Sequence, residues 1–313
     1  MPLGFERRRP LERKETAAMR LSMMLTSLLI LLPAQAMAWG DGGHSIVAEV
    51  AQHRLTPHSF DVVQKLLKSE FSAAPMGPVS LASISSWADD YRDKHKETAN
   101  WHFVDIPINV EGKKSEDVTY DEGRDCKPSD DPSGTCLVKA VEEQLQILSK
   151  PVDFNSASAV TEHTKALKFV VHLYGDMAQP LHCAERDDDG GGNGFHVFYS
   201  GPKQNSWEVR TNLHKVWDSL ILGDVQWNWN AYVQDLEQTW LKGKDESTFL
   251  AGSVVDWVNA CHQQAVRAYA LVPADLTLTQ NQLKDEKAIA DEQLAKAGVR
   301  LADALNKAFS SYP

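Results

Sequence analysis

The sequence lacks the clusters of lysine and arginine that let a protein bind a polyanion through charge alone. Acidic residues outnumber basic ones by 43 to 32, which gives a formal net charge of −11. Binding of nucleic acid through counterion release needs grouped basic side chains, so composition by itself favours an ordinary acidic protein without a basic groove. Contact with phosphate would then depend on bound metal ions, and contact with bases on aromatic stacking.

Other familiar catalytic signatures are also missing. The sequence contains no glycine-rich phosphate loop, no nucleophile elbow for a Ser/His/Asp triad, no internal repeat and no low-complexity tract. No Asn-x-Ser/Thr acceptor occurs, so N-glycosylation is not expected. These absences exclude P-loop and α/β-hydrolase chemistry.

Long apolar runs are scarce, and the clearest one lies near the amino terminus. Residues 21–32 form this run, and the small-residue sequence 36–38 follows it. A membrane span needs about 20 apolar residues, so we expect residues 1–38 to be a removable secretory signal peptide, with Met19 as an alternative start. Residues 39–313 would then form one domain, exported to the periplasm or the medium.

Cysteine is infrequent, with four residues in the chain, all of them after the leader. An even number in an exported chain favours disulfides. Cys126 and Cys136 flank a loop rich in Pro, Asp, Ser and Gly, so a local bridge is the simplest pairing. Cys183–Cys261 is then left by subtraction, although Cys183 directly follows His182, so a metal-binding role for it remains an alternative.

Apolar residues recur at helical spacing along most of the chain, which predicts a mainly α-helical domain. Short β-type runs at Phe103–Val110 and Phe195–Tyr199 predict a minor ribbon beside the helices. The expected helical segments are Ile46–Leu55, Phe60–Leu67, Leu137–Leu148, Ala166–Met177, Leu213–Leu222, Phe249–Leu271 and Ile289–Phe309.

Two short stretches carry most of the residues suited to metal binding. His172/Asp176 and His214/Asp218 are each spaced i,i+4, so on a helix both side chains of a pair point the same way, about 6 Å apart. A single pair is more often a surface hydrogen bond, but two pairs together with His182 favour a chelating site. Imidazole and carboxylate ligands suit zinc, and a carboxylate can bridge two ions.

Further candidates come earlier in the chain. Asp89 and Arg92 lie in one short segment, and His102 follows. Removal of the leader would expose the amino nitrogen of Trp39, which can chelate a metal together with its own carbonyl oxygen, and His44 follows five residues later. The alternative for Trp39 is that it merely begins the mature chain. The remaining histidines outside these stretches are expected to be exposed or hydrogen-bonded rather than ligands: His53, His58, His95, His163 and His262.

The order of these motifs resembles the zinc-dependent, single-strand-specific nuclease family of the S-one/P-one type, which is distantly related to zinc phospholipase C. The resemblance covers essentially all of the chain after residue 38. It implies a mainly α-helical fold, similar to that of phospholipase C, that holds three zinc ions at the bottom of a cleft. The motifs are W-G-x-x-G-H at 39–44, W-A-D-x-Y-R at 87–92, W-H-F at 101–103, H-x-x-G-D-M-x-Q-P-L-H at 172–182 and N-L-H-x-x-W-D at 212–218.

The resemblance also implies the ligands of each ion and the residues that act on the substrate. Asp89 would orient the attacking water, Arg92 would neutralise the phosphate oxygens, and Phe103 would stack on a base, its alternative being a residue that faces the core. The implied zinc ligands are Asp89, His102, His172 and Asp176 for the first ion, His182, His214 and Asp218 for the second, and Trp39 with His44 for the third, which Asp176 bridges to the first.

The implied activity is endonucleolytic hydrolysis of single-stranded DNA and RNA to 5′-phosphorylated products by a monomer without a membrane anchor, with 3′-nucleotidase activity. A stacked, paired base cannot reach an aromatic face beside a recessed metal cluster, which accounts for the strand preference. The acidic run 187–189 is expected to be a solvated rim, and its alternatives are that it repels a polyanion or holds a further cation. His196 is expected to touch substrate or to support a ligand.

Two other functions stay open. A zinc phospholipase C would be expected to carry Glu in the last helical ligand pair, where this chain has His214 and Asp218. A non-catalytic zinc-binding or zinc-storage protein is the other class, and Arg92 argues against it.

Overall fold

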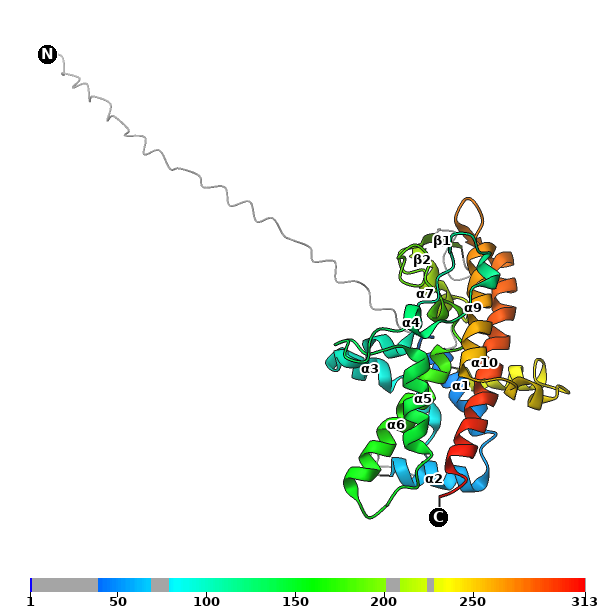
Figure 1. Ribbon diagram of the computed structural model, residues 1–313. Helices are drawn as coiled ribbons and strands as arrows, with labels where there is room; N and C mark the ends of the chain where they lie inside the picture. Colours follow the sequence, from blue (N-terminus) through cyan, green and yellow to red (C-terminus); the bar gives the residue numbers. More distant parts are fainter. Residues whose placement is uncertain (2–38, 69–78, 201–208, 224–227, 313) are drawn as a thin grey trace. The chain divides into compact units, whose positions relative to one another are not determined.

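The computed structural model describes Met1 and residues 39–68, 79–200, 209–223 and 228–312. The expected signal peptide lies outside the described residues apart from Met1, so it remains a prediction. The domain that begins at Trp39 is mainly α-helical with one small sheet, as the sequence predicts (Figure 1). 

Each expected helical segment contains or overlaps a helix, and α3, α4 and α8 are additional. The long helices α6 and α10 each begin nine residues earlier than expected. The elements are α1 (Asp41–Gln52), α2 (Pro57–Leu67), η1 (Leu81–Ile84), α3 (Trp87–Lys94), η2 (Lys96–His102), η3 (Ser115–Asp117), α4 (Glu122–Asp125), α5 (Leu137–Leu148), α6 (Ala157–Asp176), η4 (Pro180–Cys183), β1 (His196–Ser200), β2 (Val209–Asn212), α7 (Leu213–Lys215), η5 (Val216–Leu220), α8 (Trp229–Gln238), η7 (Glu246–Leu250), α9 (Val254–Leu271), β3 (Thr277–Thr279) and α10 (Gln280–Phe309).

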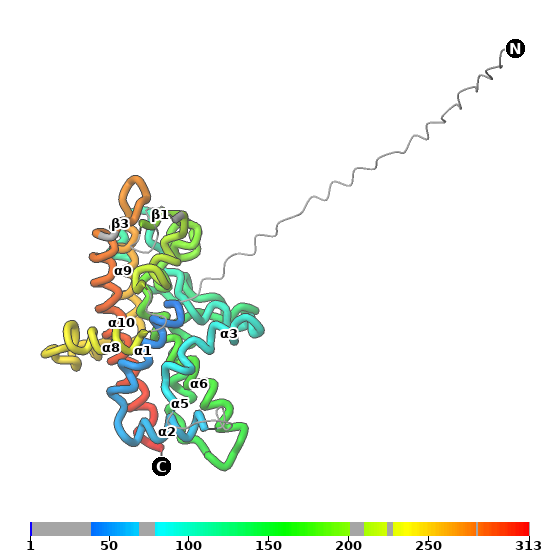
Figure 2. The backbone as a smooth tube through the Cα atoms, turned by 180° about the vertical axis from the view of Figure 1, so that it is seen from behind, coloured from blue at the N-terminus to red at the C-terminus, as the bar shows by residue number. Residues whose placement is uncertain are grey.

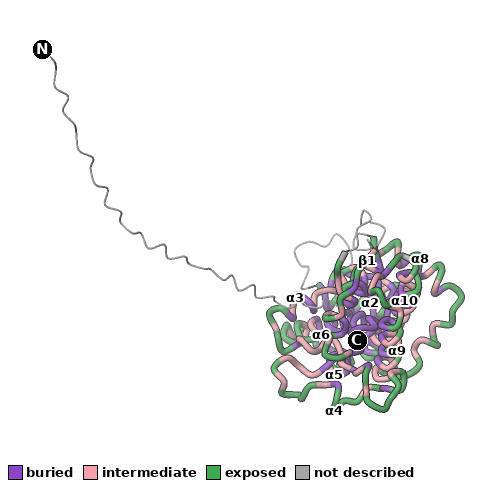
Figure 3. Tube along the Cα trace, turned by 90° about the horizontal axis from the view of Figure 1, so that it is seen from above, coloured by how far each residue is buried: buried purple, intermediate pink, exposed green. Residues whose placement is uncertain are grey.

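The core lies between long helices that pack in pairs. Helix α10 runs along α1, and α5 runs along α6, as the views from both sides show (Figures 1 and 2). The approach of α10 to α1 is close because Gly298 has no side chain: a Cβ atom there would lie 2.4 Å from Cγ1 of Val50. Buried residues gather in the middle of the domain, and exposed residues surround them (Figure 3).

Helix α6 passes through this core. Its carboxyl-terminal half, residues 166–176, is buried on every side, as expected of a helix whose apolar residues surround its axis. Ser156 caps its amino terminus by accepting a hydrogen bond from the backbone N–H of Ala159. This burial carries His172 and Asp176 into the interior of the protein.

The three-stranded sheet has β1 in the middle, antiparallel to β2 and parallel to β3. The predicted strand at Phe195–Tyr199 is therefore confirmed. The predicted strand at Phe103–Val110 is wrong: this segment is extended but makes only an isolated bridge, between Pro107 and Glu185. The bonds of this bridge join Glu185 to the carbonyl of Ile106 and the N–H of Ile108. The pairing goes no further because the partner segment turns away at Asp187 and Asp188, which have left-handed backbone conformations.

Both predicted disulfides are present. Cys126 and Cys136 are joined with a Cα–Cα distance of 5.0 Å, and Cys183 and Cys261 with a distance of 5.9 Å. The second bridge ties η4 to α9, and it leaves Cys183 unavailable as a metal ligand. Within the described ranges, no helix is long and apolar enough to cross a membrane.

Candidate metal centre

The predicted side-chain ligands come from separate parts of the chain and meet in one buried region. Helix α6 supplies two of them, and the others come from six further elements. All of them are buried. They are His44 on α1, Asp89 on α3, His102 on η2, His172 and Asp176 on α6, His182 on η4, His214 on α7 and Asp218 on η5.

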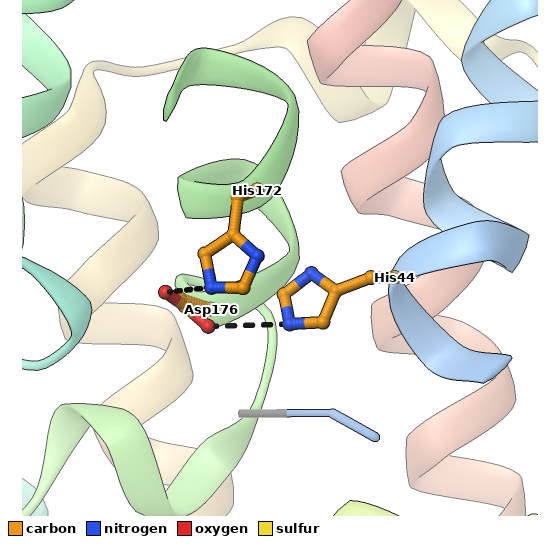
Figure 4. Close-up of side chains that lie close together, drawn as sticks. All are labelled: His44, His172 and Asp176. Atoms are coloured by element: carbon orange, nitrogen blue, oxygen red, sulfur yellow. Dashed lines mark ion pairs between the residues drawn. The ribbon is translucent and has the colours of Figure 1, made fainter. Parts of the chain in front are cut away.

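Asp176 lies at the centre of this region, with imidazoles around its carboxylate. Its Oδ1 lies 3.5 Å from Nε2 of His44, and its Oδ2 lies 3.0 Å from Nδ1 of His102 and 3.2 Å from Nε2 of His172. Figure 4 shows the rings of His44 and His172 side by side above the carboxylate, and their centroids are 3.9 Å apart. One carboxylate is thus placed to serve two neighbouring cation sites.

Asp89 closes the same region from α3. Its Oδ1 lies 3.6 Å from Nδ1 of His102 and 3.7 Å from Nε2 of His172. Asp89, His102 and His172 form one group whose potential ligand atoms all lie within 4.8 Å of one another. Nη2 of Arg92, one turn further along α3, is 3.1 Å from the same Oδ1, so a cationic donor borders the group.

His182, His214 and Asp218 form another such group. Nε2 of His182 lies 3.2 Å from Nε2 of His214, which in turn lies 3.4 Å from Oδ2 of Asp218. The Nδ1–H of each ring can donate to a backbone carbonyl at 2.7 Å, that of His102 for His182 and that of Gly191 for His214. This pairing leaves the Nε2 lone pairs directed at each other, the tautomer that binds metal.

Several polar atoms of the centre have no hydrogen-bond partner in the structure. They include both ring nitrogens of His44, both carboxylate oxygens of Asp176 and Oδ1 of Asp89. Burial of such atoms without partners costs free energy, and a cation would satisfy them. The donor set of imidazole nitrogens and carboxylate oxygens therefore fits divalent ions of the zinc type.

Electrostatics support the same interpretation. Burial lowers the pKa of His182 to about 3 and that of His214 to about 4, so both rings are neutral at neutral pH, as metal ligands must be. Burial also disfavours charge on His172, but the carboxylates of Asp176 and Asp89 outweigh it and raise the pKa of His172 to about 9. A cation that binds here would displace this proton.

Trp39 lies buried beside the centre rather than on the surface. Its ring meets that of Trp217 edge-on at 6.5 Å, and the next residue, Gly40, donates its N–H to the carbonyl of Asp218 at 2.8 Å. A Cβ atom on Gly43 would lie 2.6 Å from Cβ of Trp39, so the first turn of α1 closes tightly over this residue. The start of the expected mature chain is thus held next to the predicted ligand Asp218.

A pocket of 220 Å³ opens beside the centre. Phe103 and Leu181 form apolar walls, and Arg92 lines the pocket as well, so Phe103 is not a core residue. Asp105 and Glu185, which were not among the predicted site residues, add two carboxyl groups to the pocket. Burial, with a contribution from the charge of Glu185, raises the pKa of Asp105 to about 6. Only the position of Asp105 two residues after Phe103 could have indicated it.

Helix α9 braces the loop that carries this pocket. The Tyr269 hydroxyl donates to the carboxylate of Asp189 at 2.9 and 2.8 Å, and Oδ1 of Asp189 accepts the backbone N–H of Gly192 at 2.9 Å. The adjacent Gly191 carbonyl is the acceptor for the ligand His214. The expected solvated rim is therefore correct for the exposed residues 187 and 188, whereas Asp189 is half-buried and orders the loop.

We expect Tyr269→Phe to weaken metal binding by about 10–100-fold, the usual cost of losing a group that orients a ligand. Titration of the metal-loaded protein with a chelator measures this affinity. Tyr312→Phe is the matched control, because its buried hydroxyl donates to the carbonyl of Leu148 at 2.9 Å, far from the ligands along the sequence. Equal affinities in the two variants would contradict the role of the brace.

The other described histidines lie outside the three groups, and five of them make hydrogen-bonding contacts with other parts of the protein, as expected. His196 is exposed on β1 and belongs to none of the three groups. Hydrogen-bonding contacts outside the groups engage His53 with Glu237, His58 with the carbonyl of Phe309, His95 with Glu97, His163 with the carbonyls of Ala159 and Lys150, and His262 with the carbonyl of Cys183.

Comparison with known proteins gives the same picture. The chain is 30% identical to Nuclease P1 of Penicillium citrinum over 298 residues, which cover 87% of this chain and 98% of that protein. It is 28% identical to Endonuclease 2 of Arabidopsis thaliana, over 92% of this chain and 96% of that protein. The family model described as S1/P1 Nuclease matches residues 39–310. The chain thus belongs to the S1/P1 nuclease family and is a hydrolase that acts on the phosphodiester bonds of nucleic acids.

Proposed function

We propose that the protein is an exported, zinc-dependent endonuclease that cleaves single-stranded DNA and RNA into 5′-phosphorylated products and also removes 3′-phosphates from nucleotides. The observation that carries this proposal is the position of three buried His/Asp groups next to a pocket lined by Phe103 and Arg92. Residues 1–38 would be removed on export, and residues 39–313 would act as a single-domain monomer without a membrane anchor.

The centre would hold three zinc ions. When bound, these ions lower the pKa of a coordinated water towards about 7 and stabilise negative charge on the phosphate. Asp176 would be shared by two sites, because its two oxygens face different imidazoles. The ligands would be Asp89, His102, His172 and Asp176 for one ion, His182, His214 and Asp218 for another, and Trp39, His44 and Asp176 for the third.

The residues around the ions would position the substrate. Asp89 would accept a hydrogen bond from the attacking water, because its carboxylate is buried beside the proposed ligands His102 and His172. Arg92 borders both Asp89 and the pocket, so it would donate to the non-bridging oxygens of the phosphate. Asp89 and Arg92 are in place before the substrate binds, which reduces the reorganisation needed in the transition state.

The pocket would account for the proposed preference for single strands. A base would stack on Phe103, and the carboxyl group of Asp105 would accept a hydrogen bond from an N–H donor on its edge. A base in a duplex is stacked and paired, so it would first have to leave the helix at a cost of a few kcal/mol.

The test combines elemental analysis with activity on three substrates. We expect three zinc ions per mature chain, faster cleavage of single-stranded than of duplex DNA, and no cleavage of phosphatidylcholine. A chelator should abolish cleavage and added zinc should restore it. Fewer than two ions in active protein, or activity that resists chelation, would overturn the metal mechanism. Hydrolysis of phosphatidylcholine alone would indicate a phospholipase, and bound zinc without any hydrolysis would indicate a storage protein.

The proposed role of the amino group of Trp39 can be tested separately. A mature protein with one extra residue before Trp39 should lose one of three ions and most of its turnover, because the α-amino nitrogen becomes an amide that no longer binds metal. Elemental analysis and kcat on single-stranded DNA measure both effects. A one-residue extension after Pro313 is the control. Full activity of the amino-terminal extension would contradict the proposed role of Trp39.

A further inference from the structure

The outer face of the small sheet carries an exposed aromatic side chain. Phe198 on the central strand β1 is 37% exposed, and it is the one exposed large hydrophobic residue in the described part of the chain after residue 38. Its neighbours on the same strand, Val197 and Tyr199, are buried, so the opposite face of β1 packs on the core. The exposure of Phe198 is thus not explained by packing.

The partner strands place polar groups around this ring. Arg210 on β2 and Thr277 on β3 are paired directly with Phe198, and directly paired residues share one face of a sheet. Arg210 is exposed, and so is His196, which lies two residues before Phe198 and therefore on the same face. An aromatic ring flanked by a cation and an imidazole forms a flat, amphipathic surface, which we call the sheet platform.

The chain links the sheet platform directly to the metal centre. Strand β2 ends at Asn212, and the ligand His214 follows two residues later. The backbone N–H of Leu213 donates to the carbonyl of Phe195 at 2.9 Å, which fixes β1 against the start of α7 (Figure 1). Arg210 precedes His214 by four residues, so the two residues are close along the chain.

Charge identifies the class of molecule that would bind here. The protein as a whole is acidic, with a net charge of −11. Two exposed basic residues nevertheless lie near the start of α7: Arg210 comes shortly before this helix, and Lys215 is its last residue. Single-stranded nucleic acids bind proteins through bases stacked on aromatic rings and phosphates paired with cations. Exposed aromatic residues on the central strands of a sheet serve this purpose in RNA-binding domains.

We propose that the sheet platform binds the part of a single-stranded substrate that extends beyond the nucleotide held at the metal centre. A base stacks on Phe198, and Arg210 contacts a phosphate. This inference rests on the proposed function, because it adds a binding site for the strand whose cleavage the metal centre performs.

Substrate length is the critical variable in the test. We expect Phe198→Leu to raise KM for a 12-nucleotide single strand by about tenfold, in keeping with the loss of one stacked base, while kcat and the KM for a dinucleotide stay unchanged. Phe198→Trp should restore the wild-type KM, because tryptophan keeps a flat aromatic face whereas leucine keeps only apolarity. Arg210→Ala should lower the salt dependence of binding by about 0.7 in the log–log slope.

Two controls distinguish this proposal from an effect of net charge and from a failure of the proposed function. Lys307→Ala removes an exposed cation from the far end of α10, so it tests whether net charge alone changes the KM. Fluorescence anisotropy with a phosphorothioate 12-nucleotide strand measures binding independently of cleavage. An inactive wild-type protein would therefore refute the proposed function, and the anisotropy would still test binding at the sheet platform. Equal KM changes for the dinucleotide and the long strand, or wild-type anisotropy in Phe198→Leu, would overturn the platform.

Discussion

Asp176→Asn should reduce kcat on single-stranded DNA by at least about 10²–10³-fold, the largest single effect expected in this protein. The carboxylate of Asp176 faces His44 through one oxygen and His102 and His172 through the other. Asparagine keeps the size of the side chain but replaces one oxygen with an NH₂ group, which repels a cation. Two of the three ions would therefore lose a ligand together.

The measurement compares zinc content and kcat in the same preparation. Asp187→Asn is the matched control, because it makes the same chemical change at an exposed carboxylate that pairs with Asn109. Unfolding of both variants in the presence of a chelator shows whether either substitution lowers the stability of the fold. A variant that retains three ions and wild-type turnover would contradict the shared role of Asp176.

Much of this centre could be predicted from the sequence because it is built from local spacing. His172 and Asp176 lie one turn apart on α6, and His214 and Asp218 keep the same spacing across α7 and η5. Periodicity also predicted the long helices, whose buried faces follow from the positions of their apolar residues. The assembly of these pairs into one cluster is a tertiary property, and only the resemblance to a known family indicated it.

The sheet and the short elements were harder to predict for physical reasons. Strand β3 is only three residues long, Thr277–Thr279, too short to show a period of two. Helix α8 contains only two fully buried side chains, Val233 and Leu236, so its apolar stripe is weak. Phe103–Val110 has the composition of a strand, but its parallel partner turns away after Glu185, where Asp187 and Asp188 have left-handed backbone conformations, so only one bridge forms.

The periodicity of a sequence does not indicate where a glycine lets two elements approach closely, and Gly175 is such a residue. It lies between the two α6 ligands, and a Cβ atom there would lie 2.4 Å from Nδ1 of His44. His44 is fully buried and stacked on His172, so a shift of its ring would disturb the contact of its Nε2 with Asp176. Gly175→Ala should therefore lose the ion that His44 binds and most of the turnover on single-stranded DNA.

The effect of Gly175→Ala on stability should be modest, because alanine favours a helix by about 1 kcal/mol and overpacking costs about 1–3 kcal/mol. Gly298→Ala is the matched control: it is also helical, and its Cβ atom would lie 2.4 Å from Cγ1 of Val50, a residue that belongs to none of the three metal-binding groups. Both variants should unfold at a temperature lower by a few degrees in the presence of a chelator. Only Gly175→Ala should bind less zinc by elemental analysis, and equal zinc content in the two variants would mean that His44 is not held in place by the missing side chain.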